Sequence, residues 1–243
     1  MPYRREKFIN DEIYHIVTRG IDDNLIFKDI DDYYRGIFSI YEFNNTKPVT
    51  IFRRRREIQA LKNRLKKLGR DPASYKFLDE RKPLVEIFAF SLMPNHVHLL
   101  MRQLQDDGIT KFMLKVGSGY GGYFNRKYER KGYVFQNRFS AVHIKTEEQL
   151  KTVFVYVHTN PTSLTEPKWK EKGIKNPEKV IKFLENYKWS SYPDYIGKKN
   201  FPSVTKRDFL LKIMGGEQGC KNFVESWIKY KGEIKKFPEL ALE

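Results

Sequence analysis

The chain has 243 residues, of which 40% are hydrophobic and 15% aromatic, enough apolar material for one large domain with its own core. Its 46 Lys and Arg against 30 Asp and Glu give a formal net charge of +16, which favours nucleic acid over an anionic membrane surface as a partner. No apolar run approaches the roughly 20 residues of a membrane span, the N-terminus lacks the apolar segment of a signal peptide, and the lone Cys220 excludes an intrachain disulfide or a cysteine-based zinc cluster. We therefore expect a cytoplasmic protein with no membrane partner.

The first predicted elements are a strand and a helix. Ile13–Gly20 is expected to form a strand, with His15 on the same face as Ile13 and Val17 and with Tyr14, Ile16 and Thr18 on the other face. His15 is either a buried core residue, the commoner case, or part of a nearby site. Asp29 then resembles a helix cap and precedes apolar residues at helical spacing, namely Tyr33, Tyr34, Ile37, Phe38, Ile40 and Tyr41.

A basic segment follows between residues 44 and 83. It carries thirteen Lys and Arg residues, including Arg53, Arg54, Arg55 and Arg56, and contains little apolar material. Ile58, Leu61, Leu65 and Leu68 lie at helical spacing, so we expect a basic amphipathic helix from Arg53 to Leu68 that forms an excursion from the main domain. Such a helix either presents a solvated charged face or contacts nucleic-acid phosphates, and the density of cations favours contact.

Two strands joined by a tight turn are predicted around Pro94-Asn95, because apolar runs lie on both sides of it. Side chains alternate along a strand, so His96 and His98 face the same way. Two imidazoles on one face of a rigid strand form half of a metal site, although partly buried polar histidines would show the same pattern.

The next predicted helix, from about Ile109 to Tyr128, is rich in glycine, with Gly117, Gly119, Gly121 and Gly122. Each glycine costs a helix about 1 kcal/mol against alanine, which indicates either tight packing or close approach of another group. Residues 132–139 and Ala141–Ile144 are then expected to form a short hairpin with exposed aromatic side chains and Arg138. Aromatic faces beside cations suit unstacked bases.

A further helix is expected to begin at Thr146, which has a capping-box pattern with Gln149, and to end at Asn160-Pro161. Tyr156 and Asn160 are four residues apart and share a face. This helix can offer a phenol as nucleophile and an amide oxygen as third metal ligand. Without the histidines, the same two residues would be interpreted as a core residue and a helix cap.

Four short motifs together resemble one known family. They are Met-Pro-Asn-His-Val-His-Leu-Leu at 93–100, Tyr-Phe-Asn-Arg with the downstream Gln-Asn-Arg-Phe at 136–139, Tyr-Val-His-Thr-Asn-Pro at 156–161 and Trp-Ser-Ser-Tyr at 189–192. As a set they resemble the REP-associated tyrosine transposases, in the single-tyrosine branch of the HUH (His-hydrophobic-His) endonucleases. The resemblance covers most of residues 8–195, and the basic segment at 44–83 departs from the shorter connection expected in the family.

The resemblance implies a role for each matching residue. His96, His98 and Asn160 would hold Mg²⁺ or Mn²⁺, and Tyr156 would attack a phosphate of single-stranded DNA to form a 5′-phosphotyrosine. The implied partner is single-stranded DNA, as hairpin or repeat ends, and the implied activity is DNA transposition by strand cleavage and rejoining. Tyr120 and Tyr123 are rival nucleophiles that do not occupy the family's position before Asn-Pro.

Several questions stay open at this stage. A histidine-triad hydrolase would need a third histidine where Leu100 stands, but a replication-initiator or relaxase-type HUH nickase uses the same chemistry, and a noncatalytic or domesticated hairpin-DNA-binding protein could keep the same residues. The protein could be a monomer or a homodimer. Candidate DNA-binding residues are Arg19, Arg53, Arg54, Arg55, Arg56, Arg126 and Arg138.

The order of predicted elements indicates an α+β domain, ferredoxin-like, with an antiparallel sheet and helices on one face. We expect a transposase domain over residues 1–195 with the basic helical insertion at about 44–83. A small helical C-terminal tail over residues 196–243 would contain two helices, Thr205–Ile213 and Glu217–Lys231, whose apolar faces predict packing against the main domain.

Overall fold

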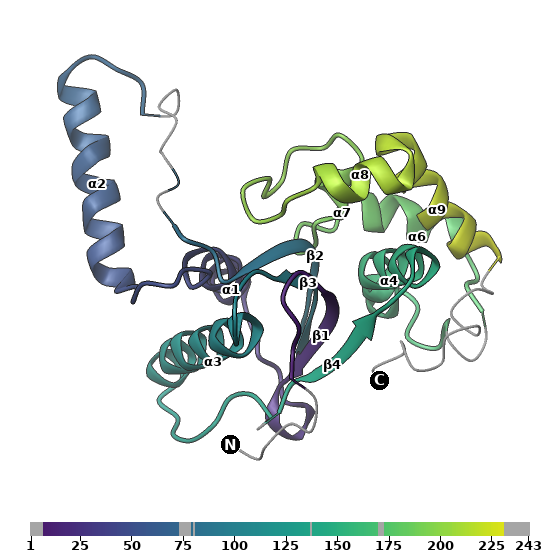
Figure 1. Ribbon diagram of the computed structural model, residues 1–243, viewed down its shortest axis with the longest axis horizontal. Helices are drawn as coiled ribbons and strands as arrows, with labels where there is room; N and C mark the ends of the chain where they lie inside the picture. The colour runs from purple at the N-terminus through teal and green to yellow at the C-terminus, as the bar shows by residue number, and fades with distance from the viewer. Residues whose placement is uncertain (1–6, 73–78, 80, 137, 170–172, 231–243) are drawn as a thin grey trace.

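The sheet has the predicted ferredoxin-like topology. A computed structural model describes residues 7–72, 79, 81–136, 138–169 and 173–230. Within them, four antiparallel strands lie in the order β2-β3-β1-β4, and helices interrupt the strands in the β-α-β-β-α-β sequence of that fold (Figure 1). The strands are β1 (Ile13–Arg19), β2 (Val85–Met93), β3 (His96–Gln103) and β4 (Ser140–Ile144).

Helices α1 (Ile30–Glu42) and α3 (Gly108–Lys127) pack on one face of the sheet. As predicted, Asp29 caps α1, because its carboxylate accepts hydrogen bonds from the backbone N–H groups of Asp31 and Asp32. The alternate residues of β3 that point to this face, Val97, Leu99 and Met101, are buried in the same core.

The opposite face is covered by α4 (Glu147–Thr159), which packs on β2 and β3 and in turn on α9 (Gly216–Tyr230). Helices therefore lie on both faces of the sheet and not on one, although the α+β class is confirmed. Apolar residues of α4, α9 and Leu100 share a second core here. The remaining short helices are η1 (Ile21–Asp23), η2 (Asn160–Leu164), α6 (Pro177–Glu185), α7 (Tyr192–Tyr195) and α8 (Asp208–Met214).

The basic segment contains the predicted helix, α2 (Ile51–Lys67), which projects away from the sheet (Figure 1). An ion pair between Arg54 and Glu42, with 3.7 Å between nitrogen and oxygen, links α2 to α1. Phe52 and Leu68 near its two ends are exposed. None of the helices that the structure describes, α2 included, combines the length and hydropathy needed to cross a bilayer.

The predicted hairpin between residues 132 and 144 is wrong. Among the described residues of this range, only Ser140–Ile144 forms a strand, and it pairs with β1, where Ile13 lies opposite Ile144. The preceding residues form a loop that contacts the end of β1, through a hydrogen bond from the Gln136 N–H to the Arg19 carbonyl (2.9 Å) and an isolated bridge between Gly20 and Phe135. Residues 140–144 therefore pair with the central strand β1 and not with the residues that precede them in the chain.

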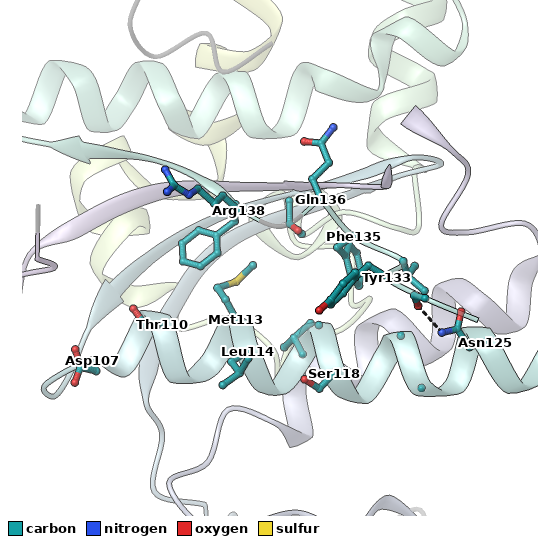
Figure 2. A pocket seen from close by; sticks show the side chains of 18 of the residues that line it. Asp107, Thr110, Met113, Leu114, Ser118, Asn125, Tyr133, Phe135, Gln136 and Arg138 are labelled. Atoms are coloured by element: carbon teal, nitrogen blue, oxygen red, sulfur yellow. Dashed lines mark hydrogen bonds between the residues drawn. The ribbon is translucent and has the colours of Figure 1, made fainter. Parts of the chain in front are cut away.

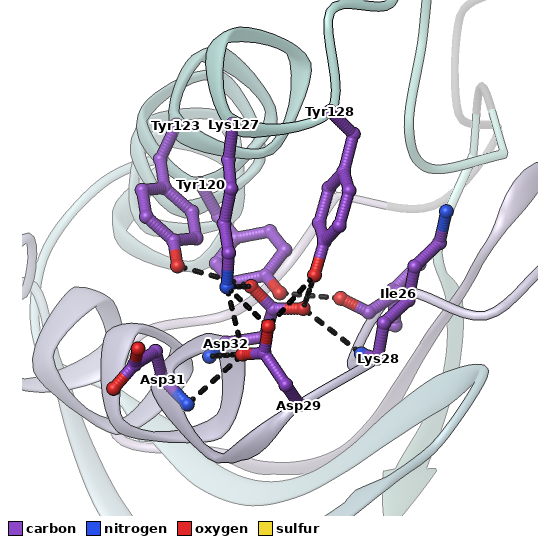
Figure 3. Close-up of polar contacts among 9 residues, drawn as sticks. All are labelled: Ile26, Lys28, Asp29, Asp31, Asp32, Tyr120, Tyr123, Lys127 and Tyr128. Carbon is purple, nitrogen blue, oxygen red and sulfur yellow. Dashed lines mark hydrogen bonds and ion pairs between the residues drawn. The ribbon is translucent and has the colours of Figure 1, made fainter.

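A buried carboxylate joins α1 to α3 (Figure 3). The Asp32 side chain is fully buried and accepts hydrogen bonds from Lys127 Nζ (2.8 Å), Tyr128 Oη (2.6 Å), Tyr123 Oη (3.0 Å) and the Lys28 N–H (2.9 Å). Burial alone would raise the pKa of Asp32, but these donors, led by Lys127, hold it below its ordinary value. Asp32 is therefore ionised at neutral pH and stabilises the contact between the two helices.

Replacing Asp32 with alanine should lower the free energy of unfolding at pH 7 by about 3 kcal/mol, because buried donors lose their partner. Replacing the exposed neighbour Asp31 should cost less than about 1 kcal/mol, since only its interaction with the helix N-terminus is lost. The pKa of Asp32 is lowered by folding, so its contribution is present above the ordinary pKa and is lost as the pH falls through the folded value. Urea unfolding of both variants at pH 7 and pH 3.5 measures this, and equal losses for the two at pH 7 would contradict it.

Candidate active site

The turn at Pro94-Asn95 places His96 directly opposite Met93, at the start of β3. His96 and His98 are two residues apart on this strand, so their side chains lie on the same face. His96 and His98 then point to the α4 side of the sheet, the side on which Leu100 is buried. Both are shielded from solvent, with 7% of the His96 and none of the His98 surface exposed.

Helix α4 carries Tyr156 and Asn160 to these histidines. The Asn160 Oδ1 lies 3.2 Å from His96 Nε2, and the Tyr156 ring stands perpendicular to the His98 ring with 5.5 Å between ring centroids. Tyr156 and Asn160 are each 3% exposed. All four residues singled out by the sequence therefore meet in one buried cluster between β3 and the C-terminal end of α4.

The protonation of His96 follows from its other contact. Asn95 Oδ1 lies 2.7 Å from His96 Nδ1, and an amide oxygen can only accept, so with the amides oriented as they are, Nδ1 carries the proton of the neutral ring. His96 Nε2 then presents a lone pair to Asn160 Oδ1, which is also an electron-pair donor. Two such atoms facing each other at 3.2 Å are the arrangement that a cation between them would stabilise.

His15 is a third histidine of the cluster. It is fully buried on β1, its Nε2 lies 3.1 Å from His98 Nδ1, and its ring meets the Tyr156 ring edge-on at 5.7 Å. Burial lowers the pKa of His15 to about 3, so the ring is neutral at physiological pH. The sequence alone left the role of His15 open, because its contact with His98 depends on the pairing of β1 with β3. The signal present in the sequence was the position of His15 on a predicted strand, which indicated the face to which its side chain points.

Within the described chain, no group of three or more His, Cys, Asp and Glu side chains could hold a metal ion. The amide oxygen of Asn160 is a polar atom of another kind beside His96 Nε2, at 3.2 Å. Amide oxygens and imidazoles are both ordinary ligands of divalent cations in proteins.

The Tyr156 hydroxyl is buried, and burial raises its pKa to about 12. The positive charge of Arg19 and the nearby Asn160 side chain oppose this increase. Arg19 lies opposite His96 in the register of β1 and β3 and forms a loose ion pair with Asp23 (3.8 Å). The structure thus places Arg19, which the sequence suggested as a DNA-binding residue, within electrostatic reach of the candidate nucleophile.

The rival tyrosines lie on the other face of the sheet, on α3. The Tyr120 hydroxyl is buried and donates to the Ile26 carbonyl, and burial raises its pKa further than that of Tyr156. The Tyr123 hydroxyl donates to Asp32. Neither tyrosine belongs to the histidine cluster.

The other candidate DNA-binding residues lie on separate elements. Arg54 and Arg56 are on α2, where Arg54 is engaged with Glu42 and Glu57 and Arg56 is exposed, while the side chains of Arg53 and Arg55 lie outside the described part of the chain. Arg126 is exposed in the last turn of α3, and Arg138 is exposed in the loop before β4. Their contact with DNA stays a prediction.

A comparison with family models agrees with the motifs. Residues 43–160 match the model of the family described as "Transposase IS200 like", a range that includes His96, His98, Tyr156 and Asn160. Among solved structures, the chain is similar to a REP-associated tyrosine transposase bound to a REP hairpin, with 13% sequence identity, a TM-score of 0.44, and coverage of 86% of this chain and 93% of that one. A comparison with curated proteins gives no match. The segment that carries His96, His98, Tyr156 and Asn160 is therefore similar to the IS200-like transposase family.

Proposed function

We propose that this protein is a transposase that cleaves and rejoins single-stranded DNA, at hairpin or repeat ends, through a 5′-phosphotyrosine formed at Tyr156 with a bound Mg²⁺ or Mn²⁺ ion. The observation that carries the proposal is the approach of Asn160 Oδ1 to within 3.2 Å of His96 Nε2, beside His98 and Tyr156. A nucleophile and three potential metal ligands from two elements meet there, in the segment that matches the family.

The donor set fits a divalent ion. Neighbouring ligands of an octahedral ion with bonds of about 2.1 Å are about 3 Å apart, which agrees with the 3.2 Å between His96 Nε2 and Asn160 Oδ1. The hydrogen bond to Asn95 also leaves the His96 Nε2 lone pair available. His96, His98 and Asn160 would hold the ion, which when bound offsets the negative charge that develops on the scissile phosphate.

His15 has a positioning role in this proposal. A proton on His98 Nδ1 can be donated to His15 Nε2, which leaves the His98 Nε2 lone pair for the ion and fixes the orientation of the ring. The neutral state of His15 is required for it to accept this hydrogen bond, and burial supplies that state. Partners of this kind set the tautomer of metal-binding histidines in other metal sites.

The expected effect of His15→Phe is a loss of roughly 10- to 100-fold in Mn²⁺ affinity, because the ring volume is kept but the acceptor for His98 is removed. Isothermal titration calorimetry with MnCl₂ measures the change. His143→Phe is the matched control, since His143 lies on β4 and pairs with Glu12 (3.0 Å). If both variants bind Mn²⁺ as the natural chain does, His15 has no such role.

The chain's own groups then carry the reaction. Tyr156 Oη attacks the phosphorus, an O–P bond forms to the tyrosine, and the bond from phosphorus to the 3′ oxygen breaks. The phenol proton passes to solvent and the departing 3′ oxygen takes one up. Arg19 favours the phenolate, because its charge opposes the rise in the Tyr156 pKa caused by burial. Attack by another 3′-hydroxyl on the phosphotyrosine reverses the step and joins two strands.

Two other functions remain as outcomes of the test. A noncatalytic or domesticated hairpin-binding protein would bind the DNA and leave it intact, and an HUH nickase would cleave it without transferring the strand. The match to a transposase family and the intact set of His96, His98, Tyr156 and Asn160 favour the transposase. The place of action we propose is the cytoplasm, where a bacterial chain would meet the nucleoid, as a monomer or homodimer.

The test uses hairpin oligonucleotides from the DNA that flanks the gene, labelled at either end and incubated with the protein and Mn²⁺ or Mg²⁺. The 3′-labelled fragment should migrate with the protein on a denaturing gel, and the 5′-labelled fragment should end in a 3′-hydroxyl that a polymerase can extend. Chelation with EDTA should prevent both. Tight binding without any cleavage would instead support the binding protein.

A further inference from the structure

A cavity lies on the other face of the sheet from the histidine cluster. It has a volume of about 610 Å³ and separates α3 from the loop residues 132–136 and 138–139 (Figure 2). This is within the range of roughly 300–1,000 Å³ found for small-molecule sites. Most of its lining is apolar, with polar side chains such as Gln136 and Arg138 on the loop.

The α3 wall of this cavity is built from glycines that protein packing does not require. A Cβ atom added at Gly117 would lie 4.0 Å from its nearest neighbour, Phe135, and one at Gly121 would lie 3.7 Å from Val134, both ordinary contacts. At Gly119, which faces away from the cavity, a Cβ atom would lie 2.2 Å from Phe43, so packing explains that glycine. Because glycine weakens a helix relative to alanine, Gly117 and Gly121 need a reason other than packing. Their lack of side chains keeps this wall of the cavity flat.

The loop wall opposite the glycines is aromatic. Tyr133 is 79% exposed, and the partly buried Phe135 lies beside it above α3 (Figure 2). An exposed tyrosine ring over a flat backbone surface matches a planar aromatic ligand better than an aliphatic one. Arg138 and Lys7 add positive charge to the lining.

The cavity and the candidate active site lie near the same end of β1, on opposite faces of the sheet. Thr18 lines the cavity, whereas Arg19, the next residue, points to the opposite face and influences Tyr156. The loop that forms the aromatic wall is held there by the hydrogen bond from Gln136 to Arg19 and the bridge between Gly20 and Phe135. The end of β1 therefore links the aromatic wall of the cavity to Arg19 on the face of the candidate active site.

We propose that this cavity binds one unstacked nucleobase of the single-stranded DNA substrate. The base lies between the glycine face of α3 and the Tyr133 ring, and Arg138 contacts a neighbouring phosphate. Stacking on an aromatic ring recognises any base by its π-face, while the cation recognises the backbone. This inference rests on the proposed function, since it deepens how the same DNA is held.

The first test measures binding of a fluorescein-labelled hairpin oligonucleotide, from the DNA flanking the gene, by fluorescence anisotropy in EDTA. Tyr133→Ala should weaken binding about 5- to 100-fold, the range for loss of one stacked base, while Tyr133→Phe should stay within about two-fold. Gly117→Leu should weaken binding equally without lowering the melting temperature, because leucine fills the cavity and favours the helix. Tyr34→Ala, an exposed aromatic on α1, is the control and should bind as the natural chain does.

A scan with single abasic nucleotides identifies the bound base. One position should weaken binding to the natural chain about as much as Tyr133→Ala does, and should cause no further loss in that variant. If Tyr133→Ala and Gly117→Leu bind normally while the natural chain still forms the covalent adduct, the base site is wrong and the proposed function stands. If the variants bind weakly but no abasic position couples to Tyr133, the contact is to the backbone and the base site is also wrong. If the natural chain neither binds nor cleaves the hairpin, the proposed function itself fails.

Discussion

Tyr156→Phe should abolish strand cleavage and leave DNA binding within about two-fold of the natural chain. The substitution removes only the hydroxyl oxygen that attacks phosphorus. Removal of an enzyme's nucleophile typically lowers the reaction rate by about a thousand-fold or more. The hydroxyl makes no hydrogen bond of ordinary geometry within the described residues, so the fold should not depend on it. Cleavage of labelled hairpin DNA under single-turnover conditions, together with anisotropy in EDTA, measures both effects.

Tyr123→Phe is the matched control for this substitution. It also removes one phenolic oxygen, but from a residue of α3 that donates to Asp32 on the opposite face of the sheet. Cleavage by this variant should match that of the natural chain, apart from any effect of lower stability. If Tyr156→Phe cleaves at the natural rate, the phosphotyrosine must form elsewhere and the proposed mechanism is wrong.

His98→Ala and Asn160→Ala should each lower Mn²⁺ affinity by more than roughly 100-fold. Loss of a residue that only hydrogen-bonds to a metal ligand already costs about 10- to 100-fold, and loss of a ligand itself should cost more. Each variant removes one of the three proposed ligands, whose side chains converge within the buried cluster. Cleavage should fall with metal occupancy, and a large excess of Mn²⁺ should partly restore it. Calorimetry with MnCl₂ and cleavage rates across a Mn²⁺ series separate binding from chemistry.

The control for the ligand variants is Thr152→Ala, on α4, the helix that Asn160 caps, where the Thr152 hydroxyl donates to the carbonyl of Glu148. This variant should bind Mn²⁺ normally. Retained affinity in both His98→Ala and Asn160→Ala would exclude them as ligands, even if cleavage were lost.

Much of the fold and cluster could be predicted because the decisive signals are local. Strand alternation placed His96 and His98 on one face, and helical spacing placed Tyr156 and Asn160 together. The caps at Asp29 and Thr146 were also visible in the sequence, because each side chain accepts from a backbone N–H two or three residues ahead.

The contacts that the sequence did not predict depend on pairing between distant elements. His15 meets His98, and Arg19 influences Tyr156, only because β1 lies between β3 and β4. The same pairing explains the wrong hairpin at residues 132–144, where aromatic residues with strand-like composition form a loop against the end of β1. Periodicity also gave no indication that α4 would cover the second face of the sheet, since that depends on the apolar helices that follow it.

The most direct test of the account is to identify the amino acid joined to DNA. The protein is incubated with hairpin DNA and Mn²⁺, the adduct is digested with protease and nuclease, and the nucleotide-bearing peptide is sequenced by mass spectrometry. We predict one modified residue, Tyr156, joined to a 5′-phosphate. A nucleotide on Tyr120, Tyr123 or any other residue, or a linkage to a 3′-phosphate, would contradict the mechanism.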